Sequence, residues 1–507
     1  MLTAAAVLMW VESVLPGRFA LLDGSAIDWT VYRGRALMEA GLWLLVLVGS
    51  WLAAARLRGL LTGALVCLVF AQLGALGLGV ASGRDEPAAG GDGKLAQLAT
   101  LSSERNVVLL ILDAVQRDYV TEILQADAQL RSQLRGFRLF TDHLAAFPTT
   151  RFSIPAMLSG RMYDNRTQAQ GFVEEAYRGE DSVAHPFRAA GFDIGIASTV
   201  GEALKLPAHH RVGVNLSQAV REGRGWSPGL ELLDLALFRS APIFAKEWLF
   251  NQDEWRLRAL SGGSRHTFHA TRSLKFLGAL GDAFRGGNPR PSLRLIHVGG
   301  AHPPVVVDRK CRYIGVQRLE EEAYRAQVEC ALRQVRDLVD RLETLGLLDR
   351  TFLAVTSDHG VRIVGRSAIE QASPTLASAM QRSGAFLMIK PFGAEGELTF
   401  DQRPTSAQDL PFLLARAIDG WDAPDEAALS AIAHGDRVRP YMHHAWQKGD
   451  WRKPHLTSLF RFEVGAGASS VEAWTYLETI SGSGLSEAAR AEQRAIELSF
   501  AGVLPPT

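Results

Sequence analysis

The apolar positions of this chain follow two different patterns. Between residues 40 and 83 the only charged side chains are Arg56 and Arg58, which leaves two long uncharged stretches. One bilayer crossing takes about 20 apolar residues, and a terminal arginine can extend its side chain to the head groups. We therefore expect a hairpin of two transmembrane helices, at about 37–56 and 59–81. The alternative is a buried helical hairpin in the core of a soluble protein.

From residue 106 onward, short continuous apolar runs alternate with amphipathic stretches. Runs of this kind are typical of strands that are buried on both faces of a parallel sheet. The expected strands are 106–112, 292–298, 351–357 and 385–390, and the expected helices are about 318–345 and the segment after Thr405-Ser406. This alternation predicts an α/β fold with a doubly wound, mostly parallel sheet.

These patterns divide the chain into four parts. The expected parts are a membrane anchor (1–83), a linker (84–100), an α/β catalytic domain (101–425) and a C-terminal extension that packs on it (426–507). Residues 200–290 break the strand–helix alternation, so we expect an insertion that covers one face of the sheet.

The composition of the chain excludes several classes of function and fold. The 507 residues carry 54 Lys and Arg against 54 Asp and Glu, and this neutrality argues against nucleic acid as a partner. Three cysteines exclude a disulfide-built scaffold and a multi-cysteine zinc module. Cys311 and Cys330 are candidates for one disulfide in an oxidising compartment, and two unpaired buried thiols are the alternative.

Polar residues of metal-binding type follow several expected strands. Asp113 directly follows the first strand, Asp358 and His359 follow the strand at 351–357, and His302 lies just past the strand at 292–298. Ligands of doubly wound sheets bind beyond the carboxyl ends of the strands, and two carboxylates with an imidazole suit a divalent metal. Each residue alone is also compatible with capping the following helix.

A hydroxyl-rich segment follows at 147–161. Thr150 and Ser153 stand where a helix is expected to begin, and the helix N-terminus favours anions there. A metal-activated hydroxyl at this position would be a nucleophile, whereas the simpler interpretation is a helix cap. Arg151 and Arg161 are candidate ligands of phosphate oxygens.

Four of these features together resemble the alkaline phosphatase superfamily, in its sulfatase-like branch. They are the strand ending at Asp113, the segment 150–161, the Gly300–Pro303 step and Ser357-Asp358-His359-Gly360. Sulfatases carry a Cys or Ser that becomes formylglycine and an Arg four residues later, where this chain has Thr150 and Ile154. Thr150, three residues before Ser153-Ile154-Pro155, is more similar to the nucleophile of the membrane-anchored phosphoethanolamine and glycerol-phosphate transferases.

The resemblance implies a set of roles. Asp113, Thr150, Asp358 and His359 would bind the metal, Thr150 would be the nucleophile, and His302 would face the leaving group. A histidine for a second metal is expected about a dozen residues after Gly360, and none occurs there. The resemblance thus implies one divalent ion, zinc or manganese rather than calcium or magnesium.

The implied reaction moves a phosphoryl-linked head group from a membrane phospholipid to an envelope lipid or glycan, through a phospho-threonine. The implied location is the inner membrane, with several spans and a periplasmic catalytic domain. The alternatives are a sulfuric-ester or phosphoric-ester hydrolase and an inactive lipid-sensing protein of the same fold.

Overall fold

The computed structural model describes residues 2–14, 29–52, 56, 59, 62–63, 66–67, 95–199, 204–213, 227–250, 255–257, 276–420, 426–445, 453–482 and 486–505. The chain forms two compact units. One comprises Met1–Asp92 and Leu216–Phe268, and the other comprises Gly93–Asn215 and His269–Thr507. We call them the N-terminal unit and the sheet unit.

The N-terminal unit is helical. Its described helices are α1 (Leu2–Val14), α2 (Arg33–Leu52), α11 (Ser227–Ser240) and α12 (Ile243–Phe250), with the short 3-10 helix η1 (Trp29–Tyr32) before α2. Phe238, Leu249, Phe250 and Trp255 form its apolar cluster. We expected residues 200–290 to cover the sheet, but the part from 216 to 268 instead belongs to this unit.

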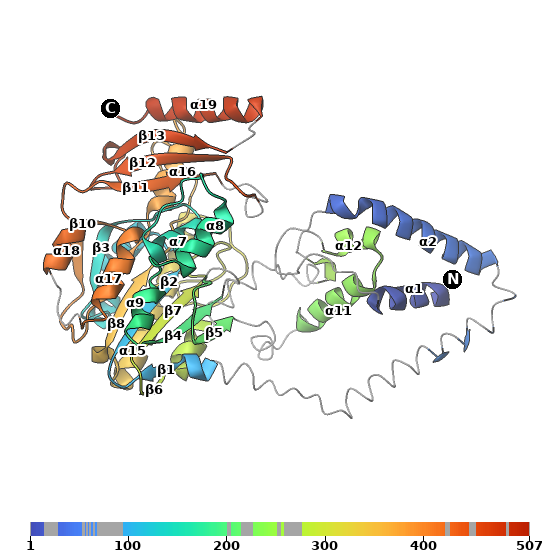
Figure 1. Ribbon diagram of the computed structural model, residues 1–507, viewed down its shortest axis with the longest axis horizontal. Helices are drawn as coiled ribbons and strands as arrows, with labels where there is room; N and C mark the ends of the chain where they lie inside the picture. Colours follow the sequence, from blue (N-terminus) through green and yellow to red (C-terminus); the bar gives the residue numbers. More distant parts are fainter. Residues whose placement is uncertain are drawn as a thin grey trace. The chain divides into compact units, whose positions relative to one another are not determined.

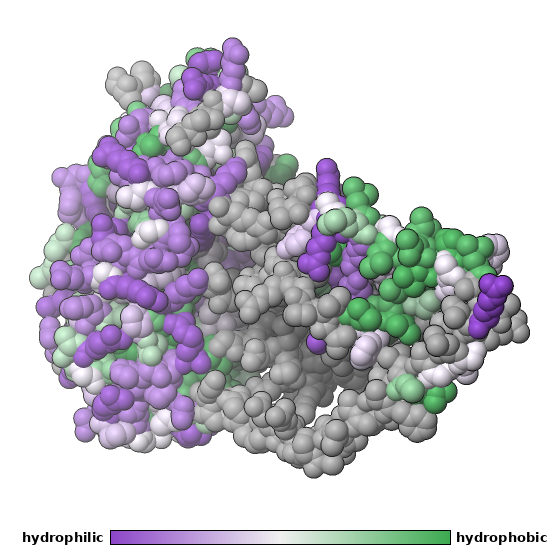
Figure 2. Space-filling view, turned by 45° about the vertical axis from the view of Figure 1, so that its right-hand side comes forward, coloured by the Kyte–Doolittle hydropathy of each residue, from purple (hydrophilic) through white to green (hydrophobic). Residues whose placement is uncertain are grey.

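Helix α2 exposes apolar side chains. Leu37, Met38, Leu45 and Leu52 are each at least 70% exposed, and Figure 2 shows a hydrophobic surface, in green, on the N-terminal unit. Among the described residues, α2 alone is long and apolar enough to cross a membrane. It covers most of the span predicted at 37–56, whereas most of the span predicted at 59–81 lies outside the described residues.

The sheet unit is built on eight strands in the order β10-β3-β9-β8-β2-β7-β4-β5 (Figure 1). Their bounds are β2 (Asn106–Leu112), β3 (Arg138–Leu144), β4 (Asp193–Ser198), β5 (His210–Gly213), β7 (Ser292–Val298), β8 (Thr351–Thr356), β9 (Leu387–Lys390) and β10 (Thr399–Ser406). All neighbouring pairs are parallel except those made by β9, which runs antiparallel to β3 and β8. The predicted mostly parallel α/β sheet is confirmed.

Helices cover both faces of this sheet, as the continuous apolar strands require. On one face, Val108 and Leu110 of β2 pack with α5 (Arg117–Ala126), α6 (Ala128–Gln133) and α15 (Glu321–Thr344). On the other, Val107, Leu109 and Ile111 pack with α7 (Thr150–Ser159), α8 (Ala169–Arg178), α9 (Ala184–Ala189) and α17 (Leu410–Arg416). Successive residues of a strand point to opposite faces, so odd-numbered β2 positions face α7.

The C-terminal part adds a second sheet. It is a three-stranded antiparallel sheet of β11 (Arg439–His443), β12 (Ser458–Val464) and β13 (Trp474–Ser481), followed by α19 (Glu487–Ala501). Phe462, Trp474 and Phe500 pack in one cluster with Leu144 at the end of β3 and Leu376 of α16 (Pro374–Ser383). Residues on β11 are thereby carried to the same end of the central sheet as the ends of its parallel strands.

Shorter elements complete the unit. They are β1 (Thr100–Ser102), which pairs with β6 (Arg285–Asn288), α18 (Glu426–Ile432) and the 3-10 helices η3 (Leu348–Arg350), η4 (Ala407–Asp409) and η6 (Val471–Ala473). Ser406 and Asp409 form a capping box at η4, directly before α17. Cys311 and Cys330 are joined by a disulfide, and Cys67 is free and exposed.

Candidate metal site and active site

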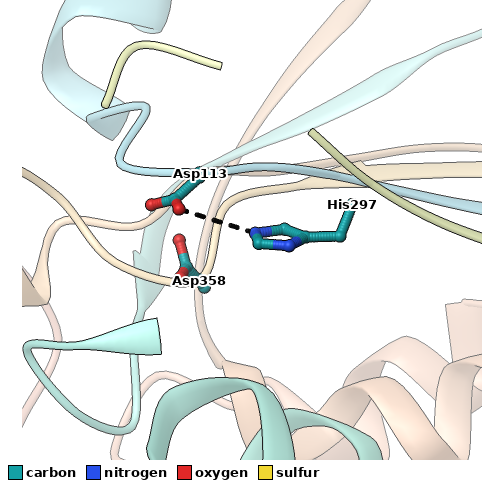
Figure 3. Close-up of side chains that lie close together, drawn as sticks. All are labelled: Asp113, His297 and Asp358. Atoms are coloured by element: carbon teal, nitrogen blue, oxygen red, sulfur yellow. Dashed lines mark ion pairs between the residues drawn. The ribbon is translucent and has the colours of Figure 1, made fainter. Parts of the chain in front are cut away.

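Three buried side chains meet at the carboxyl ends of neighbouring strands (Figure 3). Asp113 follows β2 on the α7-facing parity of Val107, Leu109 and Ile111, and Asp358 continues the parity of Phe352 and Ala354 on β8. His297 lies in β7, where it pairs in register with Ile111. The alternation of side chains along the strands therefore places all three on the sheet face that α7 covers.

The three groups lie within coordination range of one ion. One ligand atom from each of Asp113, His297 and Asp358 lies within 4.8 Å of the others. The His297 Nε2 atom is 3.6 Å from Asp113 Oδ2. Three buried atoms, Asp113 Oδ1, Asp358 Oδ2 and His297 Nε2, have no hydrogen-bond partner. Buried polar atoms are normally paired, so these unpaired atoms around one point fit a bound cation.

His359 and Thr150 extend the same cluster. The His359 Nε2 atom lies 3.7 Å from Asp113 Oδ1, 3.5 Å from Asp358 Oδ2 and 3.4 Å from Thr150 Oγ1. The other ring nitrogen, Nδ1, lies 2.8 Å from the Gly360 carbonyl oxygen and donates to it. This bond fixes the tautomer in which Nε2 carries the lone pair, as metal-binding histidines commonly do.

The backbone around the carboxylates is held by close contacts. Asp113 N donates to Val298 O at 2.9 Å, and Ala301 N donates to Asp113 O at 3.0 Å. Gly300 has a φ of +44°, and a Cβ there would lie 2.7 Å from Asp113 O, so only glycine lets this loop approach. The Gly299-Gly300 step thus fixes the position of Asp113.

Burial and mutual repulsion set the charges in the site. Burial, followed by the nearby Asp358 carboxylate, raises the pKa of Asp113 well above its usual value. Burial also opposes ionisation of Asp358, but the imidazoles of His359 and His297 lower its pKa. Burial lowers the pKa of His297 to about 4 and also lowers that of His359, so both rings are neutral near pH 7. Neutral imidazoles and a repelling carboxylate pair suit a divalent cation.

Thr150 is the first residue of α7, and it does not cap this helix. The N-cap is Thr149, which makes no side-chain capping bond and whose Oγ1 instead lies 3.3 Å from His444 Nε2. Ser153 Oγ donates to the carbonyl oxygen of Asp358 at 2.5 Å, which ties the first turn of α7 to the metal-site loop. The capping alternative for Thr150 and Ser153 is therefore not what the structure has.

The other predicted site residues lie in different surroundings. His302 is exposed, and its Nδ1 donates to the Pro303 carbonyl oxygen at 2.7 Å. Arg151 is half-buried with its guanidinium 5.5 Å from the Phe152 ring centroid. Arg161, beyond the C-terminal end of α7, is paired with Glu175 at 3.4 Å and Asp181 at 3.6 Å. The structure thus joins Asp113, Thr150, Asp358 and His359 in one cluster but places Arg161 in a surface ion-pair group.

Two residues near the cluster were not predicted from the sequence. His297 lies inside an apolar strand, and the only signal was an ionisable residue at the next-to-last position of a buried strand. Arg382, in the last turn of α16, donates to the carbonyl oxygen of Pro148 at 3.2 Å. A basic residue in a last turn is ordinarily explained by the helix dipole, so the sequence carried no signal for it.

Neither a protein-family model nor a curated protein matches the chain. Solved structures do match it, including a protein of the alkaline phosphatase superfamily from Vibrio parahaemolyticus (12% identity, 82% of this chain and 98% of that chain covered, TM-score 0.41). Others are a phosphonate monoester hydrolase from Silicibacter pomeroyi (14%, 79% and 94%, 0.40) and the soluble domain of lipooligosaccharide phosphoethanolamine transferase A from Neisseria meningitidis (14%, 66% and 94%, 0.36). One of these similar structures is thus described as a member of the superfamily that the motifs of this chain resemble.

Proposed function

We propose that this protein is a membrane-anchored, metal-dependent phosphotransferase that moves a phosphoryl-linked head group from a phospholipid to an envelope lipid or glycan. The observation that carries the proposal is the unpaired, buried ligand set of Asp113, Asp358 and His297 beside Thr150 and His359. A hydroxyl at a helix N-terminus, next to a cation site, has the two features that stabilise a transferring phosphoryl group.

The ligand set favours a borderline ion over a hard one. Two carboxylates and two neutral imidazoles offer mixed oxygen and nitrogen atoms, which suit zinc or manganese better than calcium or magnesium. Asp113, Asp358, His359 and His297 would hold one ion, with the Thr150 hydroxyl as the reacting ligand. When bound, this ion supplies a positive charge that lowers the pKa of the Thr150 hydroxyl and polarises the phosphoryl oxygens.

The chain's own residues perform the remaining tasks. The Thr150 hydroxyl gives its proton to solvent and its Oγ forms a bond to phosphorus, while the bond from phosphorus to the leaving oxygen breaks and that oxygen takes up a proton from solvent, giving a phospho-threonine and a free alcohol. The acceptor hydroxyl then loses its proton and forms a bond to the same phosphorus, while the bond from phosphorus to Thr150 Oγ breaks and the threonine takes up a proton. Ser153 holds the first turn of α7 against the Asp358 loop during this step, and the free backbone amides of the helix N-terminus face the developing charge. We propose that His302, which is exposed on the loop after β7, faces the leaving oxygen.

Two structural features support a membrane location with an exported catalytic part. Helix α2 exposes an apolar surface, and the Cys311–Cys330 disulfide is typical of proteins outside the reducing cytoplasm. The donor would then be a phospholipid of the membrane in which α2 lies, and the acceptor a lipid or glycan of the envelope.

The test combines metal content with turnover of the full chain in detergent. We expect about one zinc or manganese ion per wild-type chain, hydrolysis of an aryl phosphate ester, and loss of both in Asp113→Asn and Asp358→Asn. Thr150→Ala should keep the ion but lose at least about a thousand-fold in kcat/KM, since it removes the nucleophile. An aryl sulfate ester, run in parallel, tests the sulfuric-ester alternative.

Each outcome separates the alternatives. A wild-type chain that binds no metal and turns over neither ester would contradict the enzyme and favour a lipid-sensing protein of this fold. Turnover of the sulfate ester alone would favour a sulfatase. Full activity in Thr150→Ala would contradict the phospho-threonine.

A further inference from the structure

Arg382 connects the two loops that carry the reacting residues. Its backbone carbonyl oxygen accepts a hydrogen bond of 2.8 Å from Gly360 N, directly after His359. Its side chain reaches the other loop, where Nη1 donates to Pro148 O at 3.2 Å, two residues before Thr150. The guanidinium is thereby fixed between the His359 loop and the N-terminus of α7.

Most hydrogen-bond donors of the Arg382 guanidinium have no partner among the described residues. An arginine side chain carries five N–H donors, and the bond to Pro148 is the single hydrogen bond that this side chain makes with the described residues. No carboxylate of the described chain forms an ion pair with it, whereas neighbouring Arg362 is paired with Glu370. The side chain is half-buried, so solvent or a ligand can reach the remaining donors.

The surroundings of Arg382 favour an anion. Arg382 interacts electrostatically with His359 and His302, and also with Tyr441 and His443 of β11. None of these four side chains is a carboxylate. A fixed cation with open donors and no ion-pair partner among the described residues, beside a helix N-terminus, is a site for an oxyanion.

On these grounds we infer that Arg382 is a substrate-binding residue, whose guanidinium donates to the non-bridging oxygens of the phosphoryl group that Thr150 attacks. This inference rests on the proposed function and adds to it the residue that recognises the anion. Arg161 is an unsuitable residue for this role because Glu175 and Asp181 already occupy its guanidinium. The substrate class favoured is a phosphate ester with at least two non-bridging oxygens on the transferred phosphorus, as the diester of a phospholipid has.

The test measures binding of inorganic phosphate to the metal-loaded full chain in detergent, by calorimetry. For Arg382→Gln we expect the dissociation constant to rise about 10- to 100-fold, the range for loss of a charge-assisted hydrogen bond. Arg382→Lys should recover part of this loss, since it restores the charge but not the planar fork. Metal content and thermal unfolding should match the wild type in both variants.

A matched control variant and a second readout distinguish loss of the Arg382 contact from a general effect of removing an arginine. Arg461→Gln removes an arginine that is paired with Glu478 at 3.1 Å on the C-terminal sheet, and it should leave phosphate affinity unchanged. In turnover, Arg382→Gln should reduce kcat/KM for an aryl phosphate monoester more than for a diester, which carries less charge on the transferred group.

The outcomes distinguish this inference from the proposed function. Equal phosphate affinity in wild type and Arg382→Gln, with an active wild type, would overturn the role of Arg382 alone. Equal losses on monoester and diester would also overturn it, because they indicate a merely structural role. A wild type that neither binds phosphate nor turns over either ester would overturn both proposals.

Discussion

The role of a buried side-chain atom without a hydrogen-bond partner depends on the charges around it. The unpaired His297 Nε2 faces the carboxylates of Asp113 and Asp358, which attract a cation. His143 also has an unpaired buried Nε2, but its neighbours are Arg439 and Arg117. Because two cations exclude a metal there, His143 is a structural residue whose Nδ1 pairs with Thr405 Oγ1 at 2.9 Å.

The burial of His143 beside two arginines predicts how the stability of the protein depends on pH. Burial, followed by the nearby arginines, lowers the pKa of His143 well below 6.5 in the folded state. The unfolded chain therefore binds more protons below pH 6.5, and His143 lowers the free energy of unfolding by up to about 1.4 kcal/mol per pH unit as the pH falls. In His143→Gln the decline between about pH 7 and pH 5 should be shallower by up to this amount. Chemical denaturation across this range measures it, and parallel curves for the two proteins would contradict it.

At the residue scale the sequence predicted part of the site. Asp113, Asp358 and His359 directly follow strands, and chain direction alone places such residues at the carboxyl edge of a parallel sheet. His297 could not be assigned in this way because the face of a buried strand that bears it depends on which helix packs there. Arg382 needed knowledge of the fold, since it approaches Thr150 from a helix more than 200 residues later.

At the scale of elements, continuous apolar runs gave reliable boundaries. Strands β2 and β7 have the predicted limits, because burial on both faces keeps them mainly apolar until the strand ends. Arg294 of β7 is a buried exception and is paired with Asp193. The direction of β9 could not be predicted, since an antiparallel strand buried among parallel ones has the same composition. The three-stranded C-terminal sheet could not be predicted either, because the sequence indicated only an extension that packs on the domain.

The disulfide yields a prediction for the element that it holds. It joins Cys311, in the loop after His302, to Cys330 within α15, over a separation of 19 residues. Closing a loop of this length stabilises the folded state by about 3 kcal/mol. Cys311→Ser should therefore lower the free energy of unfolding of the oxidised protein by about this amount, as should added reductant.

The control is Cys67→Ser, which removes the free and exposed thiol. Denaturation with and without reductant should separate the two variants, since only Cys311→Ser becomes insensitive to reductant. If reductant left the wild type unchanged, the disulfide would not contribute to stability.

At the scale of the whole molecule, the chain is divided differently from its linear order. Residues 216–268 belong to the N-terminal unit, although they lie between strands of the sheet unit. Their apolar side chains, including Phe250 and Trp255, pack with Trp29 and Tyr32, which precede α2. The sequence showed that the alternation stops near residue 200, but a broken pattern does not reveal which part of the chain the segment joins.

The exposed surface of α2 predicts membrane association of the full chain. Leu44 and Leu45 are 65% and 70% exposed, and a lysine near the centre of a membrane helix costs about 2.5–3.5 kcal/mol. Leu44→Lys with Leu45→Lys should move the protein from the alkali-resistant membrane fraction to the soluble fraction. Leu498→Lys is the matched control, because Leu498 is 75% exposed on α19 of the sheet unit. Membrane retention of the double variant equal to that of the control would contradict a spanning role for α2.

In the proposed reaction, Thr150 becomes covalently attached to the group that it transfers. The most direct measurement is mass spectrometry of the Thr150 peptide after the metal-loaded full chain is incubated with phospholipid vesicles and no acceptor. We expect a phosphoryl-linked adduct on Thr150 that is absent after chelation and absent in Asp113→Asn. An unmodified Thr150 peptide in a preparation that releases the head group from the same vesicles would contradict it.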